Sequence, residues 1–392
     1  MAASQRVLIV SEHPYPSHAT LRRNVAQLLD LGVRVDLLCI ASTKGDHPHL
    51  RIFSLPMQHK RTGAARYLEE YVVFFVWAVT LALGLSIRHR YDAVLVDNPQ
   101  DFLIFTTLPA RLRGARVVLE MFELTPELTA ARMRISRRHP IVQLTRWIER
   151  IAFTLADHVI VVSQKNQDLL TQRGLDARKV SILPNTIPVA ILPASPNHAG
   201  SPTFIVTHCS LIERYGVQVA IRAFALLHPR WPELRLRVLG EGELKPALVR
   251  LTGELGLDDR VVFRGFRPWD EAMAEISQAA VGVVAIVADG YGELLFPTKL
   301  LEYVQHDVPV ACARLPTIAD YFADDSLAFF EPGDPADLAR QIEGLLKDGE
   351  AARGQARRAK VALSAISWDV LAPRYIAALG LDTRSPAAVE AC

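Results

Sequence analysis

The stretch VGVVAIVADGYGELLFPTKLLEYVQHDVPVAC, residues 281–312, decides the fold of this chain. Apolar runs stand at both its ends, at 281–287 and 308–312, and such runs are typical of strands buried on both faces of a parallel sheet. Between them, the pattern from Pro297 onward indicates a helix, because proline suits the first helical position, where its missing N–H would have no partner. The stretch therefore predicts one β–α–β unit.

The start of this predicted helix carries a lysine and, one turn later, a glutamate. Helix starts offer unpaired N–H groups and a partial positive charge, which suit an anion. Lys299 adds a positive charge suited to phosphate, and Glu302 can accept hydrogen bonds from two neighbouring hydroxyl groups. The pattern indicates a site for a nucleoside diphosphate and its ribose.

Length, charge and cysteine use narrow the class of protein. The chain has 392 residues, which favours two domains over a single core. Its net charge of +2 gives no case for nucleic-acid binding. The four cysteines lie far apart in the sequence, so no C-x-x-C or zinc-knuckle pattern is present, and a reducing, cytoplasmic setting is expected.

Strand-like and helix-like segments alternate along the whole chain, which predicts an α/β protein with parallel sheets covered on both faces. The alternation stops at residues 188–203, where four prolines occur among serine, asparagine and glycine, a composition typical of a linker. We therefore expect a first Rossmann-like domain over 1–190, a second over 200–365, and a last helix with a tail over 366–392. Ligands of doubly wound sheets bind beyond the carboxyl ends of the strands, so a cleft between two such domains is the expected place for chemistry.

Two segments of the first half raise the question of a membrane. Residues 71–87 carry no charged side chain, and as a helix they would reach about 26 Å, slightly short of a bilayer core. We expect a helix buried in the domain or docked on its surface, with a membrane-embedded helix as the alternative. Residues 132–139 hold four arginines and a histidine, which favours a solvated face or, alternatively, a face toward an anionic acceptor or a membrane surface.

Three loops of the second half are candidates for ligand contact. Gly240 and Gly242 follow a predicted strand, where they either let the backbone approach a ligand or make a tight turn. Residues 289–293 form a loop that either covers the sugar of a nucleotide or is a mobile surface loop. Arg214, in the loop 210–216, suits a diphosphate, although an arginine in such a loop is often merely solvated.

Acidic residues follow a predicted strand of the first half. Glu123 can hold hydroxyl groups of a sugar or bind an amine. For Glu127 the favoured interpretation is a helix start, with Thr125 as N-cap and Pro126 at the first helical position.

Several motifs resemble the family 4 glycosyltransferases, which have the GT-B fold. The motifs are ADHVIVVS at 156–163 followed by LPN at 183–185, and PTKLLEYVQHDVPV at 297–310; the resemblance extends over nearly the whole chain. It implies two Rossmann-like, doubly wound domains, of which the second binds a nucleotide-diphosphate sugar and the first a glycan, lipid-linked or small-molecule acceptor. The segment from Ser367 to Tyr375 resembles the family's final helix, which crosses back to the first domain. It also implies a retaining, metal-independent, hexosyltransferase-like enzyme with no cofactor.

The resemblance and the patterns above together nominate site residues. The candidate catalytic residues are Glu293, Lys299 and Arg214. The candidate donor-binding residues are Glu302, Thr298, Pro297, Leu300, Leu301, Gly240 and Gly242. The candidate acceptor-side residues are Glu123, His13 and Arg22.

The sequence also departs from the family pattern. An acid, an arginine, a lysine, a histidine and a glycine of that pattern are replaced by Leu294, Ser210, Tyr215, Phe122 and Asp307, respectively. These departures keep open the hypothesis of a non-catalytic nucleotide-sugar-binding partner on the same fold. A third hypothesis, a nicotinamide-dependent dehydrogenase, depends only on the doubly wound pattern.

Overall fold

A computed structural model describes residues 5–42, 47–57, 64–186 and 203–382. The chain forms two compact units, which we call unit 1 (Met1–Asn185 with Trp368–Cys392) and unit 2 (Thr186–Ser367). Of the predicted linker, 188–203, all but the last position lies outside the described residues, and so does the tail from 383.

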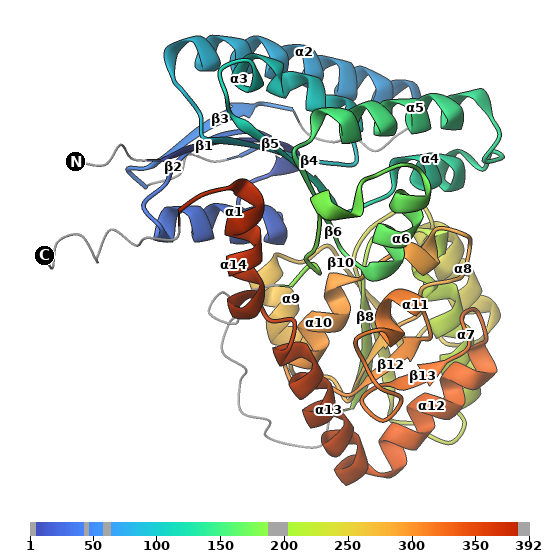
Figure 1. Cartoon of the computed structure of the whole chain (residues 1–392). Coiled ribbons are helices and arrows are strands. Elements are labelled where there is room, and N and C mark those ends of the chain that lie inside the picture. The colour runs from blue at the N-terminus through green and yellow to red at the C-terminus, as the bar shows by residue number, and fades with distance from the viewer. Residues whose placement is uncertain (1–4, 43–46, 58–63, 187–202, 383–392) are drawn as a thin grey trace, which may run out of the picture. The chain divides into compact units, whose positions relative to one another are not determined.

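Unit 1 is built on a seven-stranded sheet in the order β3-β2-β1-β4-β5-β6-β7, with every neighbouring pair parallel. Its central strands are almost wholly apolar and fully buried, because helices cover both faces of the sheet (Figure 1). The strands are β1 (Arg6–Pro14), β2 (Arg34–Ile40), β3 (Leu50–Leu55), β4 (Ala93–Asp97), β5 (Arg116–Met121), β6 (His158–Val161) and β7 (Val180–Ile182).

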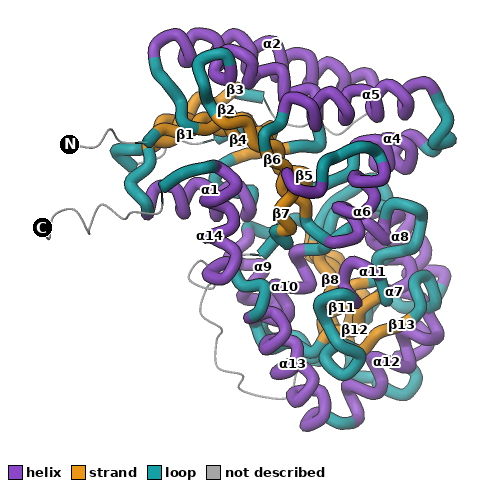
Figure 2. The backbone as a smooth tube through the Cα atoms, in the orientation of Figure 1, coloured by secondary structure: helices purple, strands orange, loops and turns teal. Residues whose placement is uncertain are grey.

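Unit 2 contains a second parallel sheet, of six strands in the order β10-β9-β8-β11-β12-β13. Figure 2 shows its strands flanked by helices, as in unit 1. The strands are β8 (Phe204–His208), β9 (Arg235–Leu239), β10 (Val261–Gly265), β11 (Val281–Val284), β12 (Val310–Ala313) and β13 (Ala328–Phe330).

The helices alternate with these strands in both units. Those of unit 1 are α1 (Ala19–Asp30), α2 (Ala64–Arg88), η1 (Asp101–Thr107), α3 (Leu108–Arg111), α4 (Thr125–Met133), α5 (Pro140–Leu155), α6 (Gln164–Gln172), η2 (Ala177–Lys179) and α14 (Trp368–Leu379). Those of unit 2 are η4 (Glu213–Tyr215), α7 (Val217–Leu227), α8 (Lys245–Glu254), α9 (Trp269–Ile276), η5 (Gly292–Leu294), α10 (Thr298–Gln305), α11 (Pro316–Ala319), α12 (Pro335–Lys347) and α13 (Gly349–Ser364).

The predicted fold class, two doubly wound parallel sheets covered by helices, is confirmed. In each sheet the strand order reverses beside the first strand of the unit. β1 lies between β2 and β4, and β8 lies between β9 and β11. Such a switch point separates the loops that follow the two neighbouring strands, and it is where open α/β sheets bind ligands.

Some boundaries differ from the sequence prediction. Pro297 is the N-cap of α10, with an extended ψ of 125°, so the helix begins one residue later than predicted. Likewise Leu124 is the N-cap of α4, and the Thr125 hydroxyl donates instead to the Pro99 carbonyl at 2.7 Å. The helix-like segment at 103–112 forms the 3-10 helix η1 followed by α3, because Pro109 has no N–H to continue an α-helical ladder.

The edge strand β3 was missing from the sequence prediction. It carries Arg51 and is only partly buried, so its apolar pattern is weak. Contacts with the neighbouring strand β2 hold β3 in place: Asp36 on β2 accepts two hydrogen bonds from Arg51, each at 2.6 Å.

The last helix, α14, belongs to unit 1, where it contacts β4, β5, β6 and β7. The Trp368 ring lies 4.0 Å from the guanidinium carbon of Arg23, which is fully buried. The indole N–H of Trp368 also donates to Gln27 at 2.9 Å. The chain therefore returns to its first sheet at the end.

Helix α2 contains the charge-free segment 71–87. Within the described residues it is the one helix long and apolar enough to cross a membrane, at Glu69–Arg88. In the structure it packs against η1 and α3, and its side chains at Phe74, Ala78 and Ala82 are fully buried. The helix is therefore docked on the domain, which agrees with the favoured sequence interpretation.

Candidate functional site

The switch point of unit 2 is surrounded by the loops that follow β8, β9, β10 and β11. The chain after β8 reaches α7 through the loop 210–216, and the chain after β11 reaches α10 through the loop 289–293. These two loops are joined by a backbone hydrogen bond from Val287 N–H to the Arg214 carbonyl at 2.9 Å. Gly216 permits this contact, because a Cβ there would lie 1.7 Å from the Ala285 carbonyl oxygen.

Lys299 lies in the first turn of α10 and is 5% exposed. Its ammonium lies 5.1 Å from the centre of the Tyr215 ring, and its Nζ has no hydrogen-bond partner of standard geometry among the described residues. The Cys209 thiol is a neighbour of this ammonium: burial raises the pKa of the thiol, and the charge of Lys299 together with hydrogen bonds from Thr207 and Lys299 partly offsets this rise. A buried ammonium with no oxygen ligand is costly to maintain, and an anion would satisfy it.

The start of α10 adds further positive potential next to Lys299. Within the part of the chain that the structure describes, no side chain caps this end of the helix, and no acidic residue occupies its first turn. The first N–H groups of a helix have no intrahelical acceptor. The helix start and the buried ammonium therefore favour the same kind of ligand, an anion such as phosphate.

Glu302, one turn further along α10, is held by two side chains from other elements. His208 Nε2, at the end of β8, lies 2.6 Å from Glu302 Oε2, and the indole N–H of Trp269, at the start of α9, donates to Oε1 at 3.0 Å. Burial raises the pKa of Glu302, but the hydrogen bonds and charge of His208 and the bond from Trp269 outweigh burial, so the pKa is lower than usual. The carboxylate is therefore ionised at neutral pH and can accept further hydrogen bonds from hydroxyl groups.

Tyr303, the residue after Glu302 on α10, also contacts His208. Its hydroxyl lies 2.9 Å from His208 Nδ1 and accepts from the His208 backbone N–H at 3.2 Å. This contact leaves Nε2 of His208 for Glu302. The His208 imidazole is thus held by Tyr303 at Nδ1 and positions the Glu302 carboxylate through Nε2.

Arg214 is neither solvated nor unpaired. Its Nε donates to Asp289 Oδ2 at 3.1 Å, and its guanidinium carbon lies 4.4 Å from the centre of the Tyr291 ring. Asp289 Oδ1 also accepts from the backbone N–H groups of Tyr291 and Gly292 at 3.0 and 2.7 Å. The loop 289–293 is therefore tied to the loop that carries Arg214, and the Arg214 guanidinium is held between Asp289 and the Tyr291 ring.

Glu293, in η5, accepts from the Gly290 backbone N–H at 2.8 Å. The neighbouring Leu294 points into the core and is buried. The acid that the family pattern has at 294 is therefore displaced by one residue, and its side chain is held by its own loop.

The two glycines after β9 serve the packing of the protein. A Cβ at Gly240, where φ is +130°, would lie 1.9 Å from the Cys209 carbonyl oxygen, and one at Gly242 would lie 2.4 Å from that of Leu211. The Gly240 N–H already donates to Gly265 at 2.8 Å. This geometry favours the tight-turn interpretation for Gly240, because both its Cβ direction and its N–H face protein.

The other residues nominated at α10 differ in how far a ligand could reach them. The side chains of Leu300 and Leu301 are fully buried in the core of unit 2. Pro297 and Thr298 are partly exposed at the start of the helix. A ligand at this helix start would thus meet Pro297, Thr298 and the backbone of the first turn, whereas the two leucines hold the helix on the sheet.

In unit 1, two of the three nominated acceptor-side residues lie near one another, at the ends of β1 and β5. His13 stacks on His18 with ring centres 4.0 Å apart, and the Phe122 ring lies 6.2 Å from His13. Asn98, after β4, holds the turn that carries Glu123, because its Oδ1 accepts from the backbone N–H groups of Phe122 and Glu123 at 2.8 and 3.2 Å.

Arg22 lies on α1, one turn after His18, and its backbone N–H donates to the His18 carbonyl at 2.9 Å. Its charge lowers the pKa of Tyr15, although burial raises that pKa more. Arg22 is thus placed on the side of α1 that carries the His18 cap, close to the end of β1.

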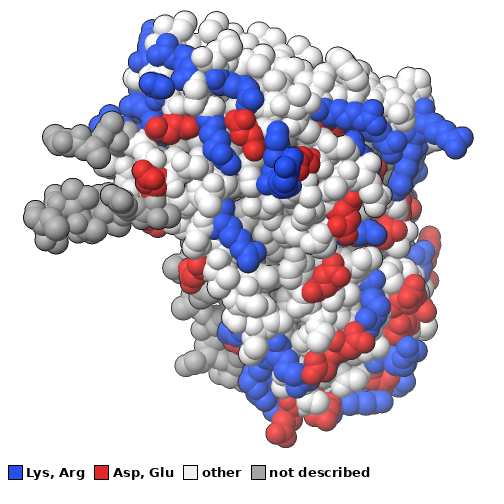
Figure 3. Space-filling model, in the orientation of Figure 1, with Lys and Arg blue, Asp and Glu red and all other residues white. Residues whose placement is uncertain are grey.

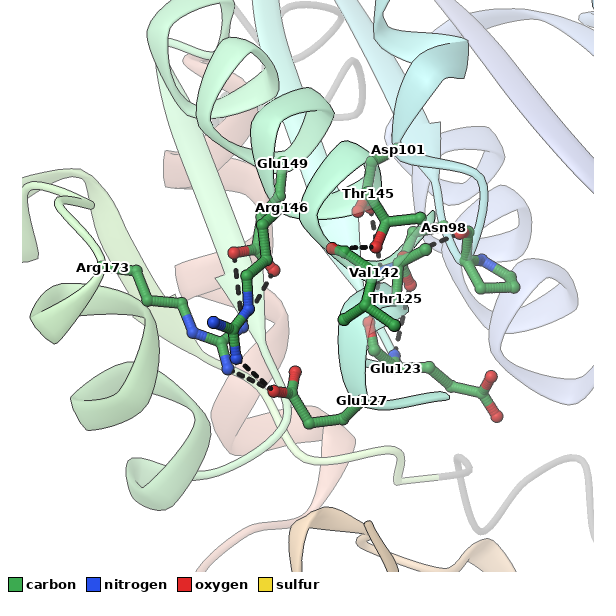
Figure 4. A network of polar contacts seen from close by, with 11 residues as sticks. Asn98, Asp101, Glu123, Thr125, Glu127, Val142, Thr145, Arg146, Glu149 and Arg173 are labelled. Atoms are coloured by element: carbon green, nitrogen blue, oxygen red, sulfur yellow. Dashed lines mark hydrogen bonds and ion pairs between the residues drawn. The ribbon is translucent and has the colours of Figure 1, made fainter. Parts of the chain in front are cut away.

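Glu127 belongs to a buried ionic network, which Figure 4 shows. Arg173 donates to Glu127 and, at 3.3 Å, to Glu149. Burial raises the pKa of Glu149 to about 8, and that of the nearby Asp101 to about 7. The side chain of Glu123 points away from this network in Figure 4, so Glu127 is structural and Glu123 remains the candidate for ligand contact.

Sequence reasoning missed His208, Trp269, Tyr303, Asn98 and His18. Tyr303 was quoted within the helix motif, but nothing in the sequence indicated that it meets a histidine 95 positions earlier. The one available signal was position, because His208 and Asn98 each stand at or directly after the end of a strand, where the ligands of parallel sheets bind.

Comparison with known proteins supports this architecture. A "Glycosyl transferase 4-like domain" model matches residues 17–186, and a "Glycosyl transferases group 1" model matches residues 202–348. The glycosyltransferase YqgM of Bacillus subtilis is 24% identical over 317 residues, which is 78% of this chain and 82% of YqgM. An exopolysaccharide phosphotransferase of Streptomyces coelicolor is 28% identical over 223 residues, but the match spans only 23% of that protein and 56% of this chain.

Solved structures show the same fold at low sequence identity. HepE of Anabaena, solved in complex with UDP, has a TM-score of 0.70 and 18% identity, covering 96% of this chain and all of the other. Glycosyltransferase models match both halves of the chain and its fold is that of known two-domain glycosyltransferases. The chain is therefore a glycosyltransferase of the GT-B fold, with a glycosyl transferase 4-like first half and a group 1 second half.

Proposed function

We propose that this protein is a retaining, metal-independent hexosyltransferase that takes its sugar from a nucleotide-diphosphate donor in the cytoplasm. The observation that carries the proposal is the buried ammonium of Lys299, which has no oxygen partner among the described residues and lies beside a helix start that none of them caps with a side chain. A diphosphate satisfies both features with one group. The free thiols of Cys39, Cys209 and Cys312 support the cytoplasmic location, since a reducing compartment keeps thiols unpaired.

The donor would lie along the start of α10. Lys299, the backbone of the first turn and Arg214 would hold the diphosphate, while Glu302, kept ionised by His208, would accept from the ribose hydroxyls. As the sugar leaves, negative charge develops on the diphosphate, and preorganised positive groups lower the energy of that state. Glu293 would contact the sugar, and unit 1 would hold the acceptor hydroxyl near Glu123, His13 and Arg22.

Known neighbours support a nucleotide donor. HepE was solved with UDP and with UDP-glucose, both at a TM-score of 0.70 to this chain. We infer from the chemistry of the site that this chain takes the same class of donor. Retention of the sugar's configuration is proposed from the resemblance at residues 297–310, and no metal is proposed because Lys299, Arg214 and the helix start supply the positive charge.

Ligand-induced stabilisation tests the donor site. A thermal-shift panel of UDP-, GDP-, ADP- and dTDP-sugars should give one nucleotide that raises Tm by several degrees at saturation. Lys299→Ala should abolish that rise. Lys245→Ala is the matched control, because Lys245 is a half-exposed lysine of α8 in the same unit, paired with Glu241, and it should leave the rise unchanged. An equal Tm rise in Lys299→Ala would refute the site.

Turnover then separates an enzyme from a binding partner. With the best donor, wild-type protein should release nucleoside diphosphate by transfer or slow hydrolysis, also in excess EDTA, and Lys299→Ala should not. NMR of the product should show the anomeric configuration of the donor. Donor binding without any turnover would instead favour the non-catalytic partner that the departures at Leu294, Ser210, Tyr215 and Phe122 suggested.

A further inference from the structure

Helix α2 presents an apolar stripe to the outside of unit 1. Its inner face is buried in the domain at Phe74, Ala78, Ala82 and Leu85. Its outer face exposes apolar side chains at a spacing that keeps them on one side of a helix, and the exposed residues are Val72, Val76, Leu83 and Ile87, with Val73 beside them. Isolated exposed apolar residues are ordinary, but a stripe along a whole helix needs an explanation.

A second helix of the same layer continues this surface. Both α2 and α5 pack against η1, so both cover the same face of the sheet. The outer side of α5 exposes Ile141, Leu144 and Trp147, three residues apart in turn. Trp147 is more than half exposed, which is unusual for a tryptophan in a protein that has no further partner. We call the outer faces of α2 and α5 the α2–α5 face.

The α2–α5 face is bordered by arginines. Residues 128–156, which include most of α4 and all of α5, hold six arginines and a single acid, Glu149. That acid is fully buried and paired with Arg173, so it does not lower the surface charge. Figure 3 shows a broad uncharged surface over α2 with Lys and Arg groups gathered on both sides of it. The exposed arginines of these elements and their ends are Arg88, Arg90, Arg113, Arg132, Arg134, Arg137, Arg138 and Arg150.

We propose that the α2–α5 face docks the protein on the surface of an anionic lipid bilayer, with α2 and α5 lying in the headgroup region. Apolar side chains between arginines are the composition of interfacial helices, and tryptophan is favoured at the boundary between headgroups and acyl chains. The positive border complements anionic headgroups, whereas nucleic acid would leave the apolar stripes exposed. α2 does not span the bilayer, because its inner face and the buried Glu70 are part of the domain core.

This proposal is independent of the sugar donor, so it is tested without one. The full chain is mixed with vesicles of phosphatidylcholine alone, or with about a third of the lipid replaced by phosphatidylglycerol, and floated on a density gradient. The protein should float with the anionic vesicles at low salt and be released at high salt, since screening weakens the arginine contacts. Equal flotation with both vesicles, or with neither, would overturn the proposal.

Paired variants test whether residues of the α2–α5 face make the contact with lipid. Arg137→Glu with Arg138→Glu should lower the vesicle partition coefficient by on the order of tenfold or more. Leu144→Gln with Val76→Gln should lower it by a smaller factor that salt does not change. The matched controls lie on α7 of unit 2, where Arg222 and Leu226 are also exposed; Arg222→Glu and Leu226→Gln should have no effect. Thermal unfolding of each variant shows that the fold is kept.

Brominated lipids report the depth of one side chain. Bromine in the upper acyl chains should quench part of the tryptophan emission of bound protein, and Trp147→Phe should remove most of the quenched fraction. Quenching that persists in Trp147→Phe would place another surface at the membrane. A dimer in solution that Trp147→Ser dissociates, with no vesicle binding in the parent, would show that a second copy of the chain covers this face instead.

Discussion

The imidazole Nε2 of His208 lies 2.6 Å from Glu302 Oε2, although the two residues are 94 positions apart in the chain. The contact keeps a nearly buried carboxylate ionised at the place proposed for the ribose. His208→Ala should therefore weaken donor binding and cost about 2 kcal/mol of stability, because a hydrogen bond to a charged group is lost. Titration calorimetry with the nucleoside diphosphate and chemical unfolding measure the two effects.

His208→Gln serves as the control for this contact, since its amide N–H2 can donate to Glu302 in place of the imidazole. It should restore part of the affinity. An alanine variant that binds donor as tightly as the parent would show that Glu302 does not need His208 for its position.

Gly240 should not tolerate a side chain. Its φ is +130° and a Cβ would lie 1.9 Å from the Cys209 carbonyl oxygen, so Gly240→Ala combines backbone strain with a clash and should cost about 3 kcal/mol or more. Gly333→Ala is the control, because Gly333 also has a positive φ, of +86°, but no atom within 4 Å of the added Cβ. It should cost only about 1–2 kcal/mol. Similar losses in urea unfolding would contradict the clash.

Trp368 should anchor α14 to unit 1. It is nearly buried and covers the guanidinium of Arg23, which is itself buried. Trp368→Ala should cost about 3–5 kcal/mol, as other removals of a buried tryptophan do, and should make the C-terminal helix more sensitive to protease. Val370→Ala, on the exposed side of the same helix, should change neither. An unchanged digestion pattern in Trp368→Ala would show that α14 is held by other contacts.

The buried Glu149 should make the protein less stable at alkaline pH. Burial raises its pKa from 4.5 to about 8, so between these values the folded state binds more protons than the unfolded state, and the free energy of unfolding falls as pH rises. Glu149→Gln should reduce this dependence, with a Tm several degrees above the parent at pH 8 and little difference near pH 5. Arg173→Gln is the companion variant, and it should increase the pH dependence. Parallel Tm curves for parent and Glu149→Gln would contradict the assignment.

Asp307 stands where the family has a glycine, and its φ of +57° explains why glycine is favoured there. Asp307→Gly should relieve strain of about 1 kcal/mol. It also removes the exposed ion pair with Lys360, 2.6 Å between Nζ and Oδ2, which contributes at most about 1 kcal/mol. Lys360→Ala measures that pair alone, so the difference between the two variants in Tm isolates the strain. A Tm of Asp307→Gly below that of Lys360→Ala would rule out backbone strain at this position.

The sequence by itself determined the repeated β–α–β units and the placement of Lys299 and Glu302 within one turn of the same helix. Both are local properties: apolar runs form buried strands wherever they fold, and two residues three apart on a helix share one side. The same locality explains the errors at Pro297 and Thr125, where the sequence gives the helix but the N-cap depends on the backbone of the preceding loop.

Only the tertiary structure decided what surrounds these residues. His208 and Trp269 meet Glu302 because their elements end at the same edge of the sheet, and Arg214 meets Asp289 because neighbouring strands bring their loops together. Gly240, which the sequence nominated for a ligand, also makes room for the backbone of Cys209. Contacts of this kind join residues that are distant in the chain, and no pattern within a single segment can specify them.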